Sequence, residues 1–199
     1  MCAREEALSA LLDPNPESKA KAARDLYQRV TSDIGNTALL DEAECHRVFN
    51  LDLEDIAQMP GRPIKPELVP AKQVPSRTPF TLEGRAALLH AITHIEFNAI
   101  NLALDAVWRF ENMPRDFYVD WLQVASEEAL HFNLLHSHLQ SLGYSYGDFN
   151  AHDGLWTMCE KTKLDIVARM ALVPRTLEAR GLRSEEHTSE LQSRLHLVC

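Results

Sequence analysis

The chain has 199 residues, which is enough for one domain with a sizeable core. Its formal net charge of −9 disfavours nonspecific binding to nucleic acid or to an acidic membrane, without excluding a local basic groove. No stretch approaches the length of a membrane span, and the acidic N-terminus "MCAREEALSALLDPNP" lacks a secretory hydrophobic core, so we expect a cytoplasmic protein with no membrane partner. Four scattered cysteines predict reduced thiols.

The first third of the chain predicts two short helices and an extended arm. Residues 3–12 and 16–32 read as helices, and Asn15 followed by Pro16 is typical of a helix start. Residues 59–80 contain six prolines, which break helices and favour extended backbone. This segment could link two domains. We favour an arm packed over a helical bundle, because it offers four aliphatic side chains for burial: Ile64, Leu68, Val69 and Val74.

Three longer helices follow, and no segment predicts a strand. The first covers residues 81–112, and the second covers residues 114–142 and ends at Gly143. The third covers residues 153–180 and has a kink at Pro174. The pattern therefore predicts an all-α protein.

Two of these helices place a carboxylate in the middle of an apolar stripe. Each residue advances a helix by about 100°, so Glu128 lies within about 40° of six apolar side chains: Trp121, Val124, Phe132, Leu135, Leu139 and Leu142. Glu96 has the same position on the preceding helix, among Leu89, Ile92, Ile100, Ala103, Val107 and Phe110. An ionised carboxylate there is unfavourable unless a bound cation, a buried Arg or Lys, or protonation compensates its charge.

His131 follows Glu128 by three residues and lies one turn away at the edge of the same stripe. The spacing Glu-x-x-His allows a carboxylate oxygen and an imidazole nitrogen to reach one metal. Bundle proteins build dinuclear sites from one Glu on each of two helices and Glu-x-x-His on each of the other two. Such mixed ligands suit iron or manganese and do not exclude zinc. Glu96, Glu128 and His131 are therefore candidate metal ligands.

Three other residues allow more than one interpretation. On periodicity alone, Glu178 of the third helix fits a surface pair with Arg175 as well as it fits a metal ligand. His90 and His94 share another face of the first long helix and could bind zinc as a pair, but nothing supplies the remaining ligands. We favour a supporting or surface role for both histidines.

The last stretch of the chain does not fit the rest. "RSEEHTSELQS" matches the in-frame translation of a widely used sequencing-adapter oligonucleotide, and the alternative is a genuine polar tail. The adapter interpretation divides the chain into three parts. Residues 1–78 form the N-terminal helices and the proline-rich arm, residues 79–182 form the helical bundle, and residues 183–199 are an artefact.

Several blocks in order resemble one known family: "RAALLHAITHIEFNAINLALDAVWRF", "SEEALHFNLLHSHLQSLGYSYGDFNAHDGLW" and "EKTKLDIVARMALVPRTLEARGL". They are similar to the family catalogued as domain of unknown function 455, of the ferritin-like superfamily, and the resemblance covers roughly residues 40–182. It implies a ferritin-like four-helix bundle, with metal ligands at Glu96, Glu128, His131 and Glu178.

The resemblance also implies a fourth core helix with a second Glu-x-x-His. Nothing in "RSEEHTSELQSRLHLVC" has that spacing. We therefore expect a truncated member of the family, with a bundle that lacks its fourth core helix and with only part of the ligand set of a dinuclear site.

Three functions follow from these observations. The first is an oxidase or hydroxylase whose full-length form holds dinuclear iron, or manganese, and acts on a small molecule or a modified nucleotide; the truncated chain would be inactive. The second is a ferroxidase or iron-storage protein, which predicts a homo-oligomer. The third is a helical interaction module whose carboxylates are structural, which predicts no stoichiometric metal.

Overall fold

The computed structural model describes residues 2–32, 40 and 59–172. Within these residues every regular element is a helix, and the β-pairing is limited to an isolated parallel bridge between Leu68 and Ala151, so the predicted all-α class is confirmed. The chain divides into two compact units, Met1–Trp156 and Thr157–Cys199. None of the described helices is both long and apolar enough to cross a membrane.

The two short helices are confirmed as α1 (Ala3–Leu12) and α2 (Pro16–Ser32). The Asn15 side-chain oxygen accepts hydrogen bonds from the backbone N–H groups of Glu17 (2.9 Å) and Ser18 (3.0 Å), so it satisfies two of the groups left open at the start of α2. The buried faces of both helices are rich in alanine, which lets helices approach one another closely: Ala3, Ala7, Ala10, Ala20 and Ala23.

The two long helices of the first unit are α5 (Leu82–Arg109) and α6 (Arg115–Ser141). The Thr81 hydroxyl accepts a hydrogen bond from the Gly84 N–H at 3.0 Å, which caps the start of α5. Gly143 has a φ of 82°, and the next N–H, of Tyr144, donates to the Leu139 carbonyl at 3.2 Å. This pattern closes α6 at the predicted glycine.

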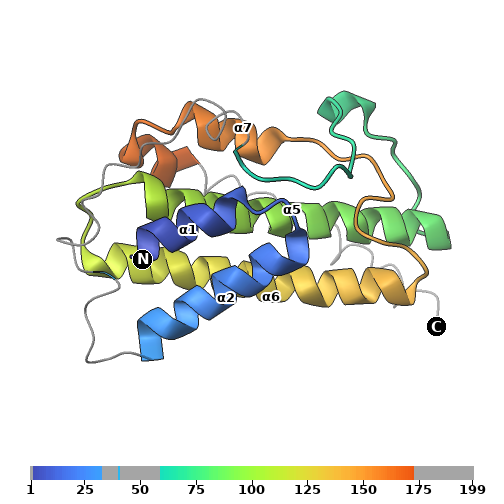
Figure 1. Cartoon of the computed structure of the whole chain (residues 1–199). Helices are drawn as coiled ribbons and strands as arrows, with labels where there is room; N and C mark the ends of the chain where they lie inside the picture. The colour runs from blue at the N-terminus through green and yellow to red at the C-terminus, as the bar shows by residue number, and fades with distance from the viewer. Residues whose placement is uncertain (1, 33–39, 41–58, 173–199) are drawn as a thin grey trace, which may run out of the picture. The chain divides into compact units, whose positions relative to one another are not determined.

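Helix α5 is the central helix of the first unit. It packs along α6, while α1 lies against α5 and α2 lies against α6 (Figure 1). Every residue from 97 to 107 is buried, so the C-terminal half of α5 is enclosed on all sides. The N-terminal half exposes Leu88 (54%) and Ile92 (37%). Glu96 therefore lies where the enclosed half of α5 meets the open half.

Lys19 on α2 connects four parts of the first unit. Its Nζ donates to the carbonyl oxygens of Leu11 (3.0 Å) and Gly61 (2.7 Å) and to the side-chain oxygen of Asn101, and it lies 4.9 Å from the ring centroid of Phe97. The three acceptors match the three N–H donors of an ammonium group. Burial lowers the pKa of Lys19 to about 7. This residue holds α1, α2, α5 and the arm together.

The arm packs through other residues than those predicted. Ile64 is fully exposed and Leu68 is 36% exposed, so the prediction that these two side chains are buried is wrong. Gly61 and Pro66 are buried instead. The Gly61 N–H donates to the Leu11 carbonyl at 2.9 Å, and a Cβ at this position would lie 2.0 Å from the carbonyl oxygen of the next residue, Leu12. Close backbone contact, which only glycine permits, therefore replaces the expected aliphatic packing.

Polar bonds hold the rest of the arm to the loop that follows α6. The Arg62 guanidinium donates two hydrogen bonds to the Asp153 carboxylate, at 2.8 and 2.9 Å. The Val69 N–H donates to the Ala151 carbonyl at 2.8 Å, and the Ala151 N–H donates to the Glu67 carbonyl at 3.0 Å. The two-pronged ion pair fixes the direction of the arm as well as its position.

The third long helix is not continuous, so the prediction of a single helix over residues 153–180 is wrong. Helix α7 ends after eight residues (Gly154–Lys161), residues 162–165 form a turn, and residues 166–172 are helical again. The turn changes the phase of the apolar pattern. As a result, two members of the predicted stripe are exposed, Leu164 at 92% and Val167 at 73%. Pro174, where the kink was predicted, lies outside the described residues.

Hydrogen bonds within the second unit explain this break. An Asp165 carboxylate oxygen accepts from the N–H groups two and three residues further on, at 2.9 and 3.0 Å, and so caps a new helix. The buried Arg169 donates to the Thr162 hydroxyl (2.7 Å) and to the Cys159 carbonyl (2.8 Å). The carbonyl at the end of α7 thus accepts from the Arg169 side chain as well as from the Thr162 N–H at 3.2 Å, a short turn that does not continue the helix.

Candidate metal centre

Glu96 on α5 and Glu128 and His131 on α6 lie side by side in the first unit. One ligand atom from each lies within 4.8 Å of the others, and within the described part of the chain no other group of three His, Cys, Asp or Glu side chains does so. The His131 Nδ1 lies 3.3 Å from a Glu128 carboxylate oxygen and 3.9 Å from a Glu96 carboxylate oxygen. The structure therefore brings three predicted ligands together. The fourth, Glu178, lies outside the described residues, and its role stays a prediction.

The cluster is half-buried and opens to solvent on one side. The side chains of Glu96 and Glu128 are 19% and 24% exposed, whereas that of His131 is 54% exposed. Glu127 points away, is exposed, and accepts a hydrogen bond from the Gln123 amide at 2.8 Å. The neighbouring carboxylate is thus outside the cluster, as its angle on the helix predicts.

The two carboxylates interact strongly with each other. Burial raises the pKa of Glu96 to about 9, and a hydrogen bond with Glu128 and the negative charge of that residue add to the effect. Glu96 therefore keeps a proton at pH 7 when no cation is near. A divalent cation would stabilise both carboxylates in their ionised form and would displace this proton.

The donor set fits a transition metal. Two carboxylates and one imidazole provide hard oxygen ligands and a nitrogen ligand of the kind that iron and manganese accept. The Glu96–Glu128 contact is unfavourable for two anions, and no Lys or Arg ion pair with either carboxylate is present among the described residues. The negative charge of these carboxylates could be balanced by a bound cation or removed by protonation, and both fit the contacts. A buried Arg or Lys partner does not.

His90 and His94 lie on a different side of α5 and are buried, so a surface role is wrong for both. The His90 Nε2 accepts a hydrogen bond from the Gly147 N–H at 2.9 Å. The His94 Nδ1 lies 2.8 Å from the Tyr146 hydroxyl, and its Nε2 lies 3.0 Å from the Asn98 amide nitrogen. Burial lowers the pKa of each imidazole to about 4, so both are neutral at pH 7.

Tyr146 was not predicted from the sequence as a functional residue, although its ring lies close to those of His90 and His94. The ring centroids are 5.3 Å from His90 and 6.1 Å from His94, and both pairs are stacked. Tyr146 belongs to a short loop between Gly143 and Gly147, both with positive φ. The glycines in "GYSYG" were the available signal, because glycines on both sides of an aromatic residue permit a sharp turn that points its ring inward.

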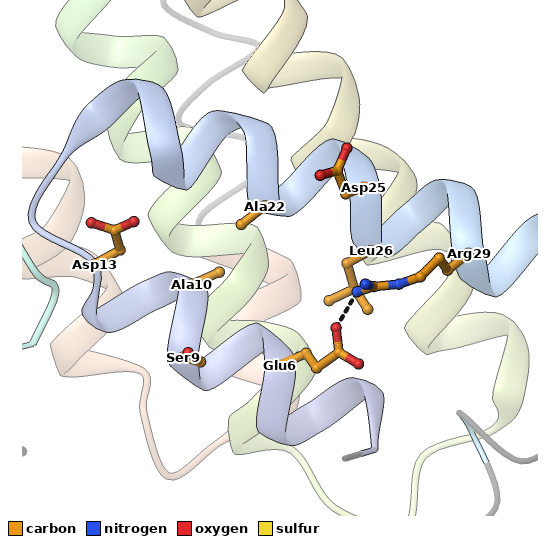
Figure 2. Close-up of a pocket in the computed structure, with 8 residues that line it drawn as sticks. All are labelled: Glu6, Ser9, Ala10, Asp13, Ala22, Asp25, Leu26 and Arg29. Carbon is orange, nitrogen blue, oxygen red and sulfur yellow. Dashed lines mark hydrogen bonds and ion pairs between the residues drawn. The ribbon is translucent and has the colours of Figure 1, made fainter.

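A second candidate is the open cavity of about 430 Å³ between α1 and α2, shown in Figure 2. Its three carboxylates already have partners: Glu6 pairs with Arg29, Asp25 pairs with Lys21, and Asp13 accepts a hydrogen bond from Ser18. Its lining contains no histidine or cysteine. We therefore assign no chemistry to this cavity, and the cluster on α5 and α6 remains the candidate site.

Comparison with known proteins places the chain in a family. The model of the family described as "Protein of unknown function (DUF455)" matches residues 12–196. The chain belongs to the DUF455 family. The matched region includes all of α5 and α6, and therefore Glu96, Glu128 and His131. It also runs into residues 183–199, whose adapter origin stays a prediction.

A relative of the chain, described as an uncharacterized protein, comes from Haemophilus influenzae and is 49% identical over 181 residues. The alignment covers 87% of this chain and 60% of that protein, so the chain spans less than two thirds of the length of its relative. No solved structure matches the chain.

Proposed function

We propose that this chain contributes the metal-binding helices of a ferritin-like oxidoreductase that uses dinuclear iron, or manganese. The proposal rests on the cluster of Glu96, Glu128 and His131, whose ligand atoms lie within 4.8 Å of one another on two adjacent helices. One helix provides a single Glu and the other provides Glu-x-x-His, which is half of the ligand pattern of dinuclear helical-bundle sites.

The residues of the cluster would have distinct roles. Glu96 and Glu128 would neutralise and hold the cation, and the ionisation of Glu96 would couple metal binding to the release of a proton. His131 is the most exposed of the three and would leave the solvent side of the site accessible to a substrate. The bound metal would supply the redox chemistry. A two-metal site needs further ligands, of which Glu178 is the one we propose.

The proposal is tested by metal binding to the purified chain. We expect the wild-type chain to bind Fe²⁺ under anaerobic conditions, or Mn²⁺, in a fixed molar ratio. Glu128→Ala should abolish this binding, because it removes the carboxylate that contacts both Glu96 and His131. Glu127→Ala is the matched control, since it removes the adjacent exposed carboxylate and should leave the binding unchanged. Equal binding by all three proteins would contradict the ligand assignment.

The same preparation distinguishes the other two functions. Iron uptake far above the molar ratio of the site, without any oxidised product, would favour an iron-handling protein. A wild-type chain that binds no stoichiometric metal would favour a helical interaction module in which the carboxylates are structural. In a full-length form of the protein, oxidation of a small molecule or a modified nucleotide that depends on Glu128 would favour the oxidoreductase.

A further inference from the structure

Three aromatic rings meet beside the metal-ligand cluster in the first unit. The ring centroids of Phe97 on α5 and Phe132 on α6 are 5.9 Å apart. Tyr146, in the loop after α6, lies 5.7 Å from the Phe97 ring and 5.4 Å from the Phe132 ring. Each ring thus contacts the other two. Both phenylalanines are fully or almost fully buried, so the contact cannot be relieved by movement into solvent.

Each of the two phenylalanines directly follows a candidate ligand in the sequence. Phe97 directly follows Glu96, and Phe132 directly follows His131. The packing of these two rings therefore bears on where the backbone segments that carry the ligands lie. Metal sites require their ligands to be held to within roughly 0.5 Å, so the separation of α5 and α6 at this level has to be fixed by packing.

A hydrogen bond holds the Tyr146 ring in place. Its hydroxyl lies 2.8 Å from the His94 Nδ1, and His94 is itself bonded to Asn98 through Nε2 at 3.0 Å. Both partners are buried in α5. The ring is thus tied to α5 through its hydroxyl, while it forms a T-shaped contact with the Phe132 ring of α6. Tyr146 therefore connects the two ligand-bearing helices.

We propose that Tyr146 is a positioning residue for the metal centre: its ring sets the distance between Glu96 on α5 and the Glu128–His131 pair on α6. This inference rests on the proposed metal-binding function. The ring determines the spacing and the hydroxyl determines the orientation of the ring. Removal of the ring should therefore disturb the site more than removal of the hydroxyl.

The experiment uses Co²⁺, whose visible absorption reports the geometry of its ligands, with the full chain and three variants. Tyr146→Ala removes the ring, and Tyr146→Phe removes only the hydroxyl. Leu26→Ala truncates a buried side chain of α2 that is not part of the aromatic cluster, and serves as the matched control for lost stability. Circular dichroism establishes that each variant is folded. If Tyr146→Ala does not fold, Tyr146→Leu, which also lacks the ring, takes its place.

We expect Tyr146→Ala to weaken Co²⁺ binding by about tenfold or more and to change the absorption spectrum. Tyr146→Phe should bind within about threefold of the wild type, as supporting residues that keep their packing have smaller effects. Leu26→Ala should lower the melting temperature without changing the dissociation constant or the spectrum. A structural role alone would make Tyr146→Ala behave like Leu26→Ala.

Two negative results are distinguishable. If the wild type binds Co²⁺ and Tyr146→Ala binds it with the same dissociation constant and spectrum, the positioning role is refuted and the metal-binding proposal stands. If the wild type itself binds no Co²⁺, Fe²⁺ or Mn²⁺, the proposed function fails, and the positioning role fails with it.

Discussion

Glu96 keeps its proton far above the usual range of a carboxylate, because it is partly buried and shares a hydrogen bond with Glu128. This arrangement is unfavourable for the folded chain without metal. The folded state can hold Glu96 only in its protonated form, which lowers the free energy of unfolding at pH 7, and evolution of a purely structural helix pair would favour a side chain that is neutral without this cost. A residue that weakens the fold but suits a cation supports the proposed metal site.

Glu96→Gln tests this conclusion through the stability of the metal-free protein. The folded state raises the pKa of Glu96 from 4.5 to about 9, so between these values the folded state binds more protons than the unfolded state. The free energy of unfolding therefore falls as the pH rises through this range. Glutamine removes this dependence, and because solvent screens this partly exposed pair we expect only part of the full linkage, so Glu96→Gln should be about 1–2 kcal/mol more stable than the wild type at pH 8. Urea unfolding at pH 5, 6.5 and 8 measures the difference.

The same variant should have the opposite effect on metal binding. Glutamine cannot supply an ionised oxygen, so Glu96→Gln should weaken Fe²⁺ or Mn²⁺ binding while it stabilises the metal-free chain. If Glu96→Gln were less stable than the wild type at pH 8, the carboxylate would support the fold, and this result would argue against a metal site at this position.

At the scale of elements, periodicity predicted those helices whose ends are set by local residues. Asn15, Thr81 and Gly143 lie at the boundaries of α2, α5 and α6, and each acts on backbone groups within four residues of itself. The angle of Glu96 and Glu128 on their helices was enough to bring them to the shared side of α5 and α6. Both predictions needed only information contained in one helix.

The predictions that failed depended on competing local bonds or on distant partners. The third helix was predicted as continuous because its apolar spacing runs across Asp165, which in the structure caps a new helix. Lys19 and Tyr146 contact residues 42 or more positions away, at Gly61, Asn101 and His94. No pattern within one helix reports such contacts. Side chains around the ligands were therefore harder to predict than the ligands themselves.

The break after α7 leads to a prediction at this scale. Asp165→Ala removes the acceptor for two N–H groups at the start of residues 166–172 and should destabilise this helical segment by about 1 kcal/mol. Asp165→Asn keeps a capping oxygen and is the matched control. Amide hydrogen exchange of residues 166–172 measures the effect. Equal exchange rates in wild type and Asp165→Ala would show that the buried Arg169 alone sets the break.

At the scale of the whole molecule, buried titratable groups act on stability in opposite directions. The pKa values of His90 and His94 fall from 6.5 to about 4, so their contribution is present above pH 6.5 and is lost as the pH falls toward 4. The Lys19 pKa falls from 10.5 to about 7, so the unfolded state binds more protons between these values and stability rises with pH there. Glu96 acts in the opposite sense from pH 4.5 to 9.

These directions predict the shape of the stability profile. Below pH 6.5 the two histidines outweigh the single carboxylate, so the free energy of unfolding should rise as the pH increases from 4.5 to 6.5. Between pH 7 and 9 the rise due to Lys19 and the fall due to Glu96 overlap and oppose each other. The metal-free wild type should therefore have a nearly flat profile in this upper range.

Single substitutions should separate the two opposing contributions. Glu96→Gln should leave a profile that rises from pH 7 to 9, because only the Lys19 contribution remains. Lys19→Met should leave a profile that falls over the same range, and it should also be less stable at every pH, because the carbonyls of Leu11 and Gly61 lose their buried donor. Lys21→Met, at a site where the side chain is 76% exposed on the same helix, should keep the wild-type profile.

Urea unfolding at half-unit pH steps compares the slopes. Parallel profiles for Glu96→Gln and Lys19→Met would mean that neither group titrates in this range. Glu96 would then hold no proton for a metal to displace, and the stability profile would no longer support the proposed metal site.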